Sequence, residues 1–169
     1  MTDQELQHSL ERLRAGDREA FTAIYQSLKT PVYTVLVRLT GDRALSEDLL
    51  QEVFLKLYRQ PPSVEKPRAY LFRMARNLAT DALRKTCPQD SLEELELPAR
   101  EDDPGLRVDL ERAFARLPLS RRQVVALHLN GGLTFRQVAE IVEKPLGTVL
   151  WQYHKAIEQL RNDLDGGSL

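Results

Sequence analysis

The chain has 169 residues, of which 42% are hydrophobic and 29% charged, with eight Gly, nine Pro and one Cys. This composition supplies enough apolar side chains for a buried core, which excludes collagen and a chain that is disordered throughout. Cys87 has no partner in the chain for an internal disulfide, so a disulfide scaffold is excluded and a reducing compartment is expected.

The formal net charge of −1 hides an uneven distribution of charge along the chain. Residues 1–85 carry 14 Lys and Arg against 11 Asp and Glu, and residues 107–169 carry nine against seven. Between them, residues 86–106 carry one Arg against seven acids and include three prolines. Such a stretch is typical of a linker. We therefore predict two small domains, 1–85 and 107–169, joined by a flexible acidic linker over 86–106.

Apolar residues of the first block recur at helical spacing, and no run alternates with period two, so the fold is predicted to be all-α. A weak helix is expected near residues 4–14. Four stronger helices are expected to begin at polar caps or prolines. The first is predicted to follow Asp17 and to end at Thr30-Pro31, where a second begins that ends at Gly41. A third is predicted from Asp42 to Pro61 and a fourth from Lys66 to about Lys85.

The second block has the same all-α pattern in shorter units. Asp103-Pro104 is expected to cap a helix that Pro118 ends, and Ser120 to cap a helix that runs to Gly131-Gly132. Thr134 with Gln137 has the form of a capping box, which begins a short helix up to Glu143. A longer helix is predicted from about Leu146 to Leu164. Two helices joined by a tight turn resemble a helix-turn-helix.

The sequence lacks the signatures of an enzyme or a metal protein. His8, His128 and His154 lie far apart and form no metal-binding motif, and no glycine-rich phosphate loop follows a strand. We therefore expect no catalytic residue, no metal, no cofactor and no small-molecule substrate. Apolar stretches are far shorter than the roughly 20 residues that span a bilayer. The first residues also lack the pattern of a signal peptide, so we expect a cytoplasmic protein without stable membrane insertion.

The segment from Lys66 to Lys85 has six Lys and Arg against one acid. Arg73, Arg76 and Asn77 fall within one helical turn, and Tyr70 lies one turn earlier. Cations for phosphates, a ring for stacking and an amide for base edges suit single-stranded nucleic acid. The alternative is an ordinary amphipathic helix with a solvated basic face and Tyr70 in the core.

The helix-turn-helix from Thr134 to about Leu164 is the second constellation that suggests a function. Such a motif places the start of its second helix in the major groove. The residues expected there are Thr148, Leu150, Trp151, Gln152, His154 and Lys155. Gln152 could pair with adenine, and Arg136 or Lys155 could bind phosphate. The alternatives are a helical hairpin that is purely structural and a protein–protein module.

In the order and spacing of its motifs, the sequence resembles the extracytoplasmic-function (ECF) sigma factors, which are two-domain bacterial transcription initiation factors. The resemblance covers nearly the whole chain. The segments that carry it in the first domain are 16–21, 48–54 and 71–84. Those in the second are Leu117-Pro118, Arg122, Leu133-Thr134, 138–140, 147–149 and Leu160-Arg161.

The resemblance implies a role for each matching residue. Asp48, Gln51, Glu52 and Lys56 would bind core RNA polymerase, through the coiled-coil clamp helices of its largest subunit. Tyr70, Arg73, Arg76 and Asn77 would bind the melted minus-ten promoter element, and the loop from Arg59 to Lys66 would help to form a pocket for a flipped base. Arg136, Thr148, Leu150, Trp151, Gln152 and Lys155 would read the double-stranded minus-thirty-five element. An anti-sigma factor is the partner expected to regulate such a protein.

The second domain departs from the family pattern at several positions. Leu150-Trp151-Gln152 stands where a basic residue, Ser and Arg are common, which predicts a weaker phosphate contribution to binding. Trp151 is expected to pack on the thymine methyl or sugar, or in the domain core. Glu143 replaces the usual turn glycine, which costs about 1 kcal/mol if its backbone is left-handed.

Two other functions stay open on the sequence. A stand-alone helix-turn-helix regulator would need only the second domain, but it leaves residues 48–54 and the basic helix unexplained. A sigma-like adaptor would occupy the polymerase without reading DNA, and the weakly basic Leu150-Trp151-Gln152 supports it.

Overall fold

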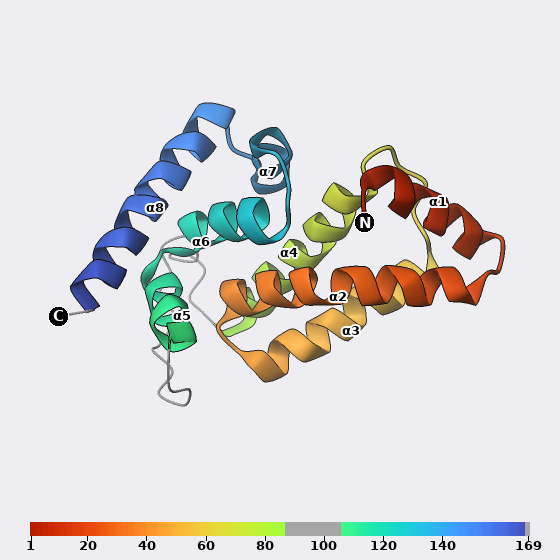
Figure 1. The fold of residues 1–169 in the computed structure, drawn as a ribbon, viewed down its shortest axis with the longest axis horizontal. Helices are drawn as coiled ribbons and strands as arrows, with labels where there is room; N and C mark the ends of the chain where they lie inside the picture. Colours follow the sequence, from red (N-terminus) through yellow and green to blue (C-terminus); the bar gives the residue numbers. More distant parts are fainter. Residues whose placement is uncertain (87–105, 168–169) are drawn as a thin grey trace.

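Every element in the described part of the chain is a helix, which confirms the predicted all-α fold (Figure 1). A computed structural model describes residues 1–86 and 106–167. Cys87, the Asp103-Pro104 cap and residues 87–105 of the predicted linker lie outside this part. The elements are α1 (Asp3–Arg14), α2 (Arg18–Thr40), α3 (Arg43–Arg59), α4 (Pro67–Thr86), α5 (Leu106–Arg116), α6 (Leu119–Val125), η2 (Ala126–Asn130), α7 (Phe135–Val142) and α8 (Leu146–Gly167).

Several predicted caps are present. The side chain of Asp17 accepts a hydrogen bond from Glu19 N, and that of Asp42 accepts one from Leu45 N. Gly41 ends α2 in a left-handed conformation with φ 66°, which glycine adopts without steric cost. The weak first helix is better defined than its sequence suggested, because Thr2 and Glu5 form a complete capping box.

The predicted helix boundary at Thr30-Pro31 is wrong, because α2 continues through Pro31 as one helix of 23 residues. The apolar residues on both sides of the proline share one register and are all fully buried. They are Ile24, Leu28, Val32, Val35, Leu36 and Leu39. Each such burial stabilises the fold by roughly 1.5–3 kcal/mol, whereas a proline inside a helix costs about 3 kcal/mol. The continuous apolar face therefore prevails over the local breaking signal.

The helix predicted from Ser120 ends before Gly131 as expected, but it differs in its start and in its winding. Pro118 is the N-cap, and after Val125 the chain changes to a π-helix over Ala126–Asn130. Gly131 N then donates to Ala126 O at 3.0 Å. A Cβ atom on Gly131 would lie 2.5 Å from Leu127 O, so only glycine fits this tight turn.

The first half of the molecule (residues 1–86) and the second half (residues 106–167) share a core. A single cluster of buried apolar side chains includes Leu36 and Ala75 from the first half and Val124 and Leu127 from the second. In Figure 1 the second half lies over the C-terminal end of α2, with α6 and η2 packed against that helix. Arg122 is fully buried at this contact, and its guanidinium donates to Leu117 O at 2.8 Å and Leu39 O at 3.2 Å.

The turn between α7 and α8 is strained at Glu143. Its backbone is left-handed, with φ 57° and ψ 46°, and no other non-glycine residue in the described ranges has a positive φ. For a residue with a Cβ atom this conformation costs about 1 kcal/mol or more.

We expect Glu143→Gly to raise the free energy of unfolding by about 1 kcal/mol, because glycine removes this strain. Urea denaturation followed by circular dichroism measures the change. Glu140→Gly is the matched control, since Glu140 is also exposed but lies inside α7, where glycine should cost about 1 kcal/mol. Equal stabilities for Glu143→Gly and the unmodified chain would contradict the strain.

Candidate functional site

One side of α3 presents a polar stripe. The four residues predicted to contact the polymerase are all exposed on it: Asp48, Gln51, Glu52 and Lys56. Leu49, Val53 and Leu57 lie on the opposite side of the helix and are buried in the core. Lys56 Nζ lies 3.5 Å from Glu52 Oε1, so the stripe carries one exposed ion pair. The core thus turns this stripe outward and leaves it available to a partner.

Three of the four residues predicted to bind the minus-ten element form an exposed line on α4. Tyr70, Arg73 and Asn77 follow each other at steps of three and four residues, which places them on one face of the helix. Leu71, Phe72 and Ala75 anchor the other side in the core. A ring, a cation and an amide therefore lie in a row on a rigid element, as binding of a single strand requires.

The fourth residue, Arg76, points toward the second half of the molecule and is half-buried. Its Nε donates to Gln123 Oε1 of α6 at 3.0 Å, and its Nη1 donates to Asn77 Oδ1 at 3.1 Å. The structure thus brings Arg76 beside Asn77, as the sequence predicts. It also engages the guanidinium in a contact between the halves that the sequence did not indicate.

The loop between α3 and α4 is tied to α1. Gln7 Nε2 donates to Val64 O at 2.9 Å and to Glu65 O at 3.2 Å, and Arg14 Nη1 donates to Pro62 O at 2.6 Å. These bonds satisfy backbone carbonyls of a segment that has no secondary structure of its own. The loop predicted to receive a flipped base therefore has a fixed position next to α4.

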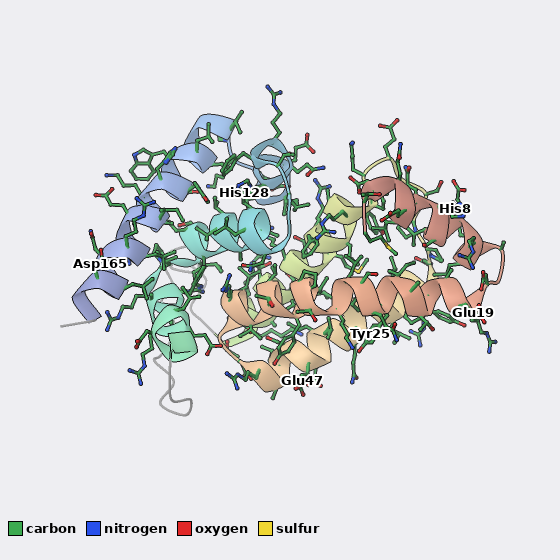
Figure 2. The ribbon with its side chains drawn as sticks, viewed as in Figure 1. His8, Glu19, Tyr25, Glu47, His128 and Asp165 are labelled. Atoms are coloured by element: carbon green, nitrogen blue, oxygen red, sulfur yellow. The ribbon has the colours of Figure 1, made fainter. Side chains whose placement is uncertain are left out.

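Helices α7 and α8 form the predicted helix-turn-helix. The capping box of Thr134 and Gln137 begins α7, as expected. His128, labelled in Figure 2, donates from Nδ1 to Leu133 O at 2.8 Å, and its ring stacks on that of Phe135 with the ring centroids 3.9 Å apart. These contacts fix the approach to α7. Val138 and Val149 are fully buried, so the two helices pack on the core rather than on each other alone.

The residues predicted to read the minus-thirty-five element differ in exposure. Arg136, Thr148, Trp151, His154 and Lys155 are exposed, while Leu150 and Gln152 are half-buried. Of the two placements expected for Trp151, the core is wrong: its side chain is 55% exposed, with the Arg121 guanidinium 5.7 Å from the ring centroid. Lys155 Nζ lies 3.6 Å from Glu158 Oε2, which offsets part of its charge.

Comparison with known proteins identifies the family. Residues 24–87, which include all of α3 and α4, match the sigma-70 region 2 family. The chain is 27% identical over 177 residues to the ECF RNA polymerase sigma factor SigW of Bacillus subtilis, with 92% of this chain and 94% of the relative covered. It is 29% identical over 173 residues to SigK of Mycobacterium tuberculosis, with 92% and 91% covered. The chain belongs to the ECF RNA polymerase sigma factors.

Members of this family direct RNA polymerase to promoters and have no enzymatic activity of their own. Two solved structures share the fold of this sigma factor. The sigma factor RpoE, solved in complex with the anti-sigma factor NepR from Bartonella quintana, matches with a TM-score of 0.67 at 21% identity over 86% of this chain and 96% of that one. CnrH, solved with the cytosolic domain of CnrY, matches with a TM-score of 0.70 at 16% identity over 96% and 98%.

The structure adds two apolar residues to the polar stripe of the sigma factor's α3. Leu55 is 46% exposed and Tyr58 is 39% exposed, and both continue the line of Asp48, Gln51 and Glu52 along the helix. The ring of Tyr58 packs edge-on against that of Phe21, with the ring centroids 5.1 Å apart, and this contact holds Tyr58 in place. Tyr25, labelled in Figure 2, extends this aromatic group, since its ring centroid lies 5.0 Å from that of Phe54. The helical spacing alone could have revealed both residues.

In residues 1–86 and 106–167, no helix is long and apolar enough to cross a bilayer. The same ranges contain no group of three or more His, Cys, Asp and Glu side chains that could hold a metal ion.

We expect the double variant Gln7→Ala, Arg14→Ala to speed amide hydrogen exchange in residues 60–66 at least tenfold, because each lost bond releases a loop carbonyl from α1. Hydrogen–deuterium exchange with mass spectrometry measures this effect, with peptides from α3 as the internal reference. Gln4→Ala is the control, since Gln4 is an exposed residue of the same helix. Unchanged exchange in the loop would show that α1 does not hold it.

Proposed function

We propose that this sigma factor binds core RNA polymerase through α3, stabilises the melted minus-ten element on α4 and reads the minus-thirty-five element with α8. The observation that carries the proposal is the exposed line of Tyr70, Arg73 and Asn77 on α4, beside a loop fixed by α1. In this assignment residues 1–85 act as sigma region 2 and residues 107–169 as sigma region 4. The acidic residues 86–106 connect them and thread toward the active-centre cleft of the polymerase.

The chemistry of the α4 line suits a strand whose bases are unstacked. The ring of Tyr70 offers a stacking surface, Arg73 a phosphate contact and Asn77 an amide for a base edge. Flipping a base costs a few kcal/mol, which contacts of this kind and binding to the polymerase must offset. Because α4 is anchored in the core, these side chains are positioned before the DNA arrives.

The second half supports recognition of a duplex. Exposed Arg136 and Lys155 suit phosphate contacts, which would set the position of the protein on DNA. Trp151 is exposed at the start of α8, where its apolar ring suits the thymine methyl or the sugar. With so few cations on α8, we expect a shallow dependence of this binding on salt.

The proposed partners are core RNA polymerase, promoter DNA and an anti-sigma factor. Two structurally similar proteins support the last of these, since RpoE was solved with the anti-sigma factor NepR and CnrH with the cytosolic domain of CnrY. A protein that works on the polymerase and on DNA would act in the cytoplasm.

Run-off transcription from a fragmented genomic library tests the proposal, with core polymerase alone and with the purified protein added. New start sites that share two spaced upstream motifs are the expected result. Co-purification with the core without new start sites would instead support a polymerase-binding adaptor. Binding of palindromic duplexes by a dimer without the core would support a stand-alone regulator.

We expect the double variant Tyr70→Ala, Arg73→Ala to lower promoter opening ten- to a hundredfold while it still binds the core, because stacking of one base is worth roughly 1–3 kcal/mol. Permanganate reactivity of thymines in the minus-ten element measures opening, and co-purification measures core binding. The control is Arg84→Ala, which removes an exposed cation of α4 that pairs with Asp81 at 3.2 Å. Normal opening by the double variant would exclude this face as the DNA site.

We expect the double variant Leu55→Ala, Tyr58→Ala to weaken core binding at least tenfold, because exposed apolar side chains inside a polar stripe are typical hot spots of an interface. Fluorescence anisotropy of the labelled sigma factor titrated with core polymerase measures the affinity. Leu164→Ala removes an apolar side chain of α8 that is 37% exposed and serves as the control. An unchanged affinity of the double variant would place the core contact elsewhere.

A further inference from the structure

Helix α6 packs against α8 (Figure 1) and places Arg121 beside Trp151. The guanidinium of Arg121 lies over the Trp151 ring, 5.7 Å from the ring centroid, and a cation within about 6 Å of a centroid is attracted by the electrons of the ring. Trp151 nevertheless stays 55% exposed, because Arg121 covers only part of it. One face of the ring is thus supported by the protein, and the rest is open to a ligand.

Arg121 is itself held by α8. Its Nη1 donates to Gln159 Oε1 at 3.2 Å, and Gln159 Nε2 donates in turn to Arg116 O at 3.4 Å. Gln159 lies about two turns after Trp151 on the same helix. Because a guanidinium is planar and rigid, a bond at one nitrogen limits the orientation of the whole group. Arg121 therefore connects the middle of α8 to the ring near its start.

The position of Trp151 on α8 indicates what the open side of the ring would meet. Trp151 lies in the second turn of this helix, and a helix-turn-helix places the start of its second helix in the major groove. The 5-methyl group of thymine is the apolar group that base pairs expose there. A methyl group packs on the face of an indole ring, which offers no conventional hydrogen bond to a polar base edge. The ring is therefore better matched to thymine than to the other bases.

The support from Arg121 matters because Trp151 is exposed. An exposed side chain that rotates freely must be ordered when it binds, and this loss of entropy weakens binding. A ring that is already held in place avoids much of this loss. Contact with a single methyl group also depends on accurate placement, since dispersion attraction falls steeply when two atoms separate by about 1 Å.

We propose that Arg121 is a positioning residue, which holds the Trp151 ring for contact with the 5-methyl group of a thymine in the minus-thirty-five duplex. The proposal deepens the proposed function and rests on it, since it assumes that α8 enters the major groove. It gives a role in DNA recognition to a residue that lies outside α7 and α8. It also chooses the methyl group over the sugar as the contact of Trp151.

The fluorescence of Trp151 tests the positioning without DNA, because this is the one tryptophan of the sequence. Time-resolved anisotropy of the free, full-length chain measures the fast local motion of the ring. Arg121→Ala should about double the amplitude of this motion, because it removes the cation over the ring. Gln159→Ala should raise the amplitude by less, since it removes only the bond that holds Arg121.

Arg112→Ala is the matched control for these two variants. It removes an exposed cation of α5, so the motion of the ring should match that of the unmodified chain. Far-UV circular dichroism verifies that each variant keeps its helices. Equal amplitudes in the unmodified chain, Arg121→Ala and Gln159→Ala would overturn the positioning role.

Replacing thymine by deoxyuridine tests the methyl contact, because it removes the 5-methyl group and nothing else. The holoenzyme, formed from core polymerase and the full-length chain, is titrated into labelled promoter duplexes found by run-off transcription. The thymines of the upstream motif are replaced one at a time, and fluorescence anisotropy measures the affinity. Replacement of one thymine should weaken binding about fourfold, the effect expected for one buried methyl group.

The variants then show whether this preference depends on the two side chains. Trp151→Ala should bind the thymine and deoxyuridine duplexes equally, and Arg121→Ala should lower the fourfold preference to less than about twofold. Arg112→Ala should keep the full preference. Because a lost phosphate contact weakens binding to both duplexes by the same factor, the ratio separates positioning from a contribution of charge alone.

An unchanged ratio in Arg121→Ala would overturn the proposal, and so would a motif in which no thymine can be replaced with loss of affinity. In both cases the proposed function stands, since the holoenzyme still binds its promoters. If the unmodified holoenzyme binds no promoter, the proposed function fails and the methyl contact fails with it.

Discussion

The packing of both halves of the molecule on α2 determines the rest of the structure. The first half buries the apolar face of this helix against α1, α3 and α4, while α6 and η2 cover its C-terminal end. Arg122 fixes the contact of α6 with the C-terminal end of α2, because its buried guanidinium donates to Leu39 O of α2. Since one rigid helix serves both halves, their relative position is set by its length and its faces. Gln123 consequently lies within reach of Arg76.

The sequence predicted the local features of the fold because their causes lie within a few residues. The Asp42 cap and the Thr134–Gln137 box depend on side chains three positions from the backbone groups that they satisfy. The predicted boundary at Pro31 was wrong for the opposite reason. The cost of the proline is local, but the burial that offsets it comes from the other helices packed around α2. The π-helix over Ala126–Asn130 likewise has no signal in its own residues.

The candidate site likewise has features that the sequence predicted and features that it did not. The exposure of the α3 stripe and of Tyr70, Arg73 and Asn77 follows from helical periodicity once the apolar side is known. The partner of Arg76 did not follow, because Gln123 lies 47 residues away and belongs to the other half. The bond from Gln7 to Val64 spans 57 residues and was equally hidden. Sequence patterns indicate which side of a helix faces inward, but they do not show what packs against its outer side.

Three arginines of the first half, Arg38, Arg68 and Arg76, lie at the interface with the second half, where their guanidinium groups need acceptors. A guanidinium left without acceptors would be too costly to bury. The amide oxygen of Gln123 accepts from Arg76, and the backbone oxygen of Gly131 accepts from Arg68. These bonds therefore add directional contacts to the apolar core that the two halves share.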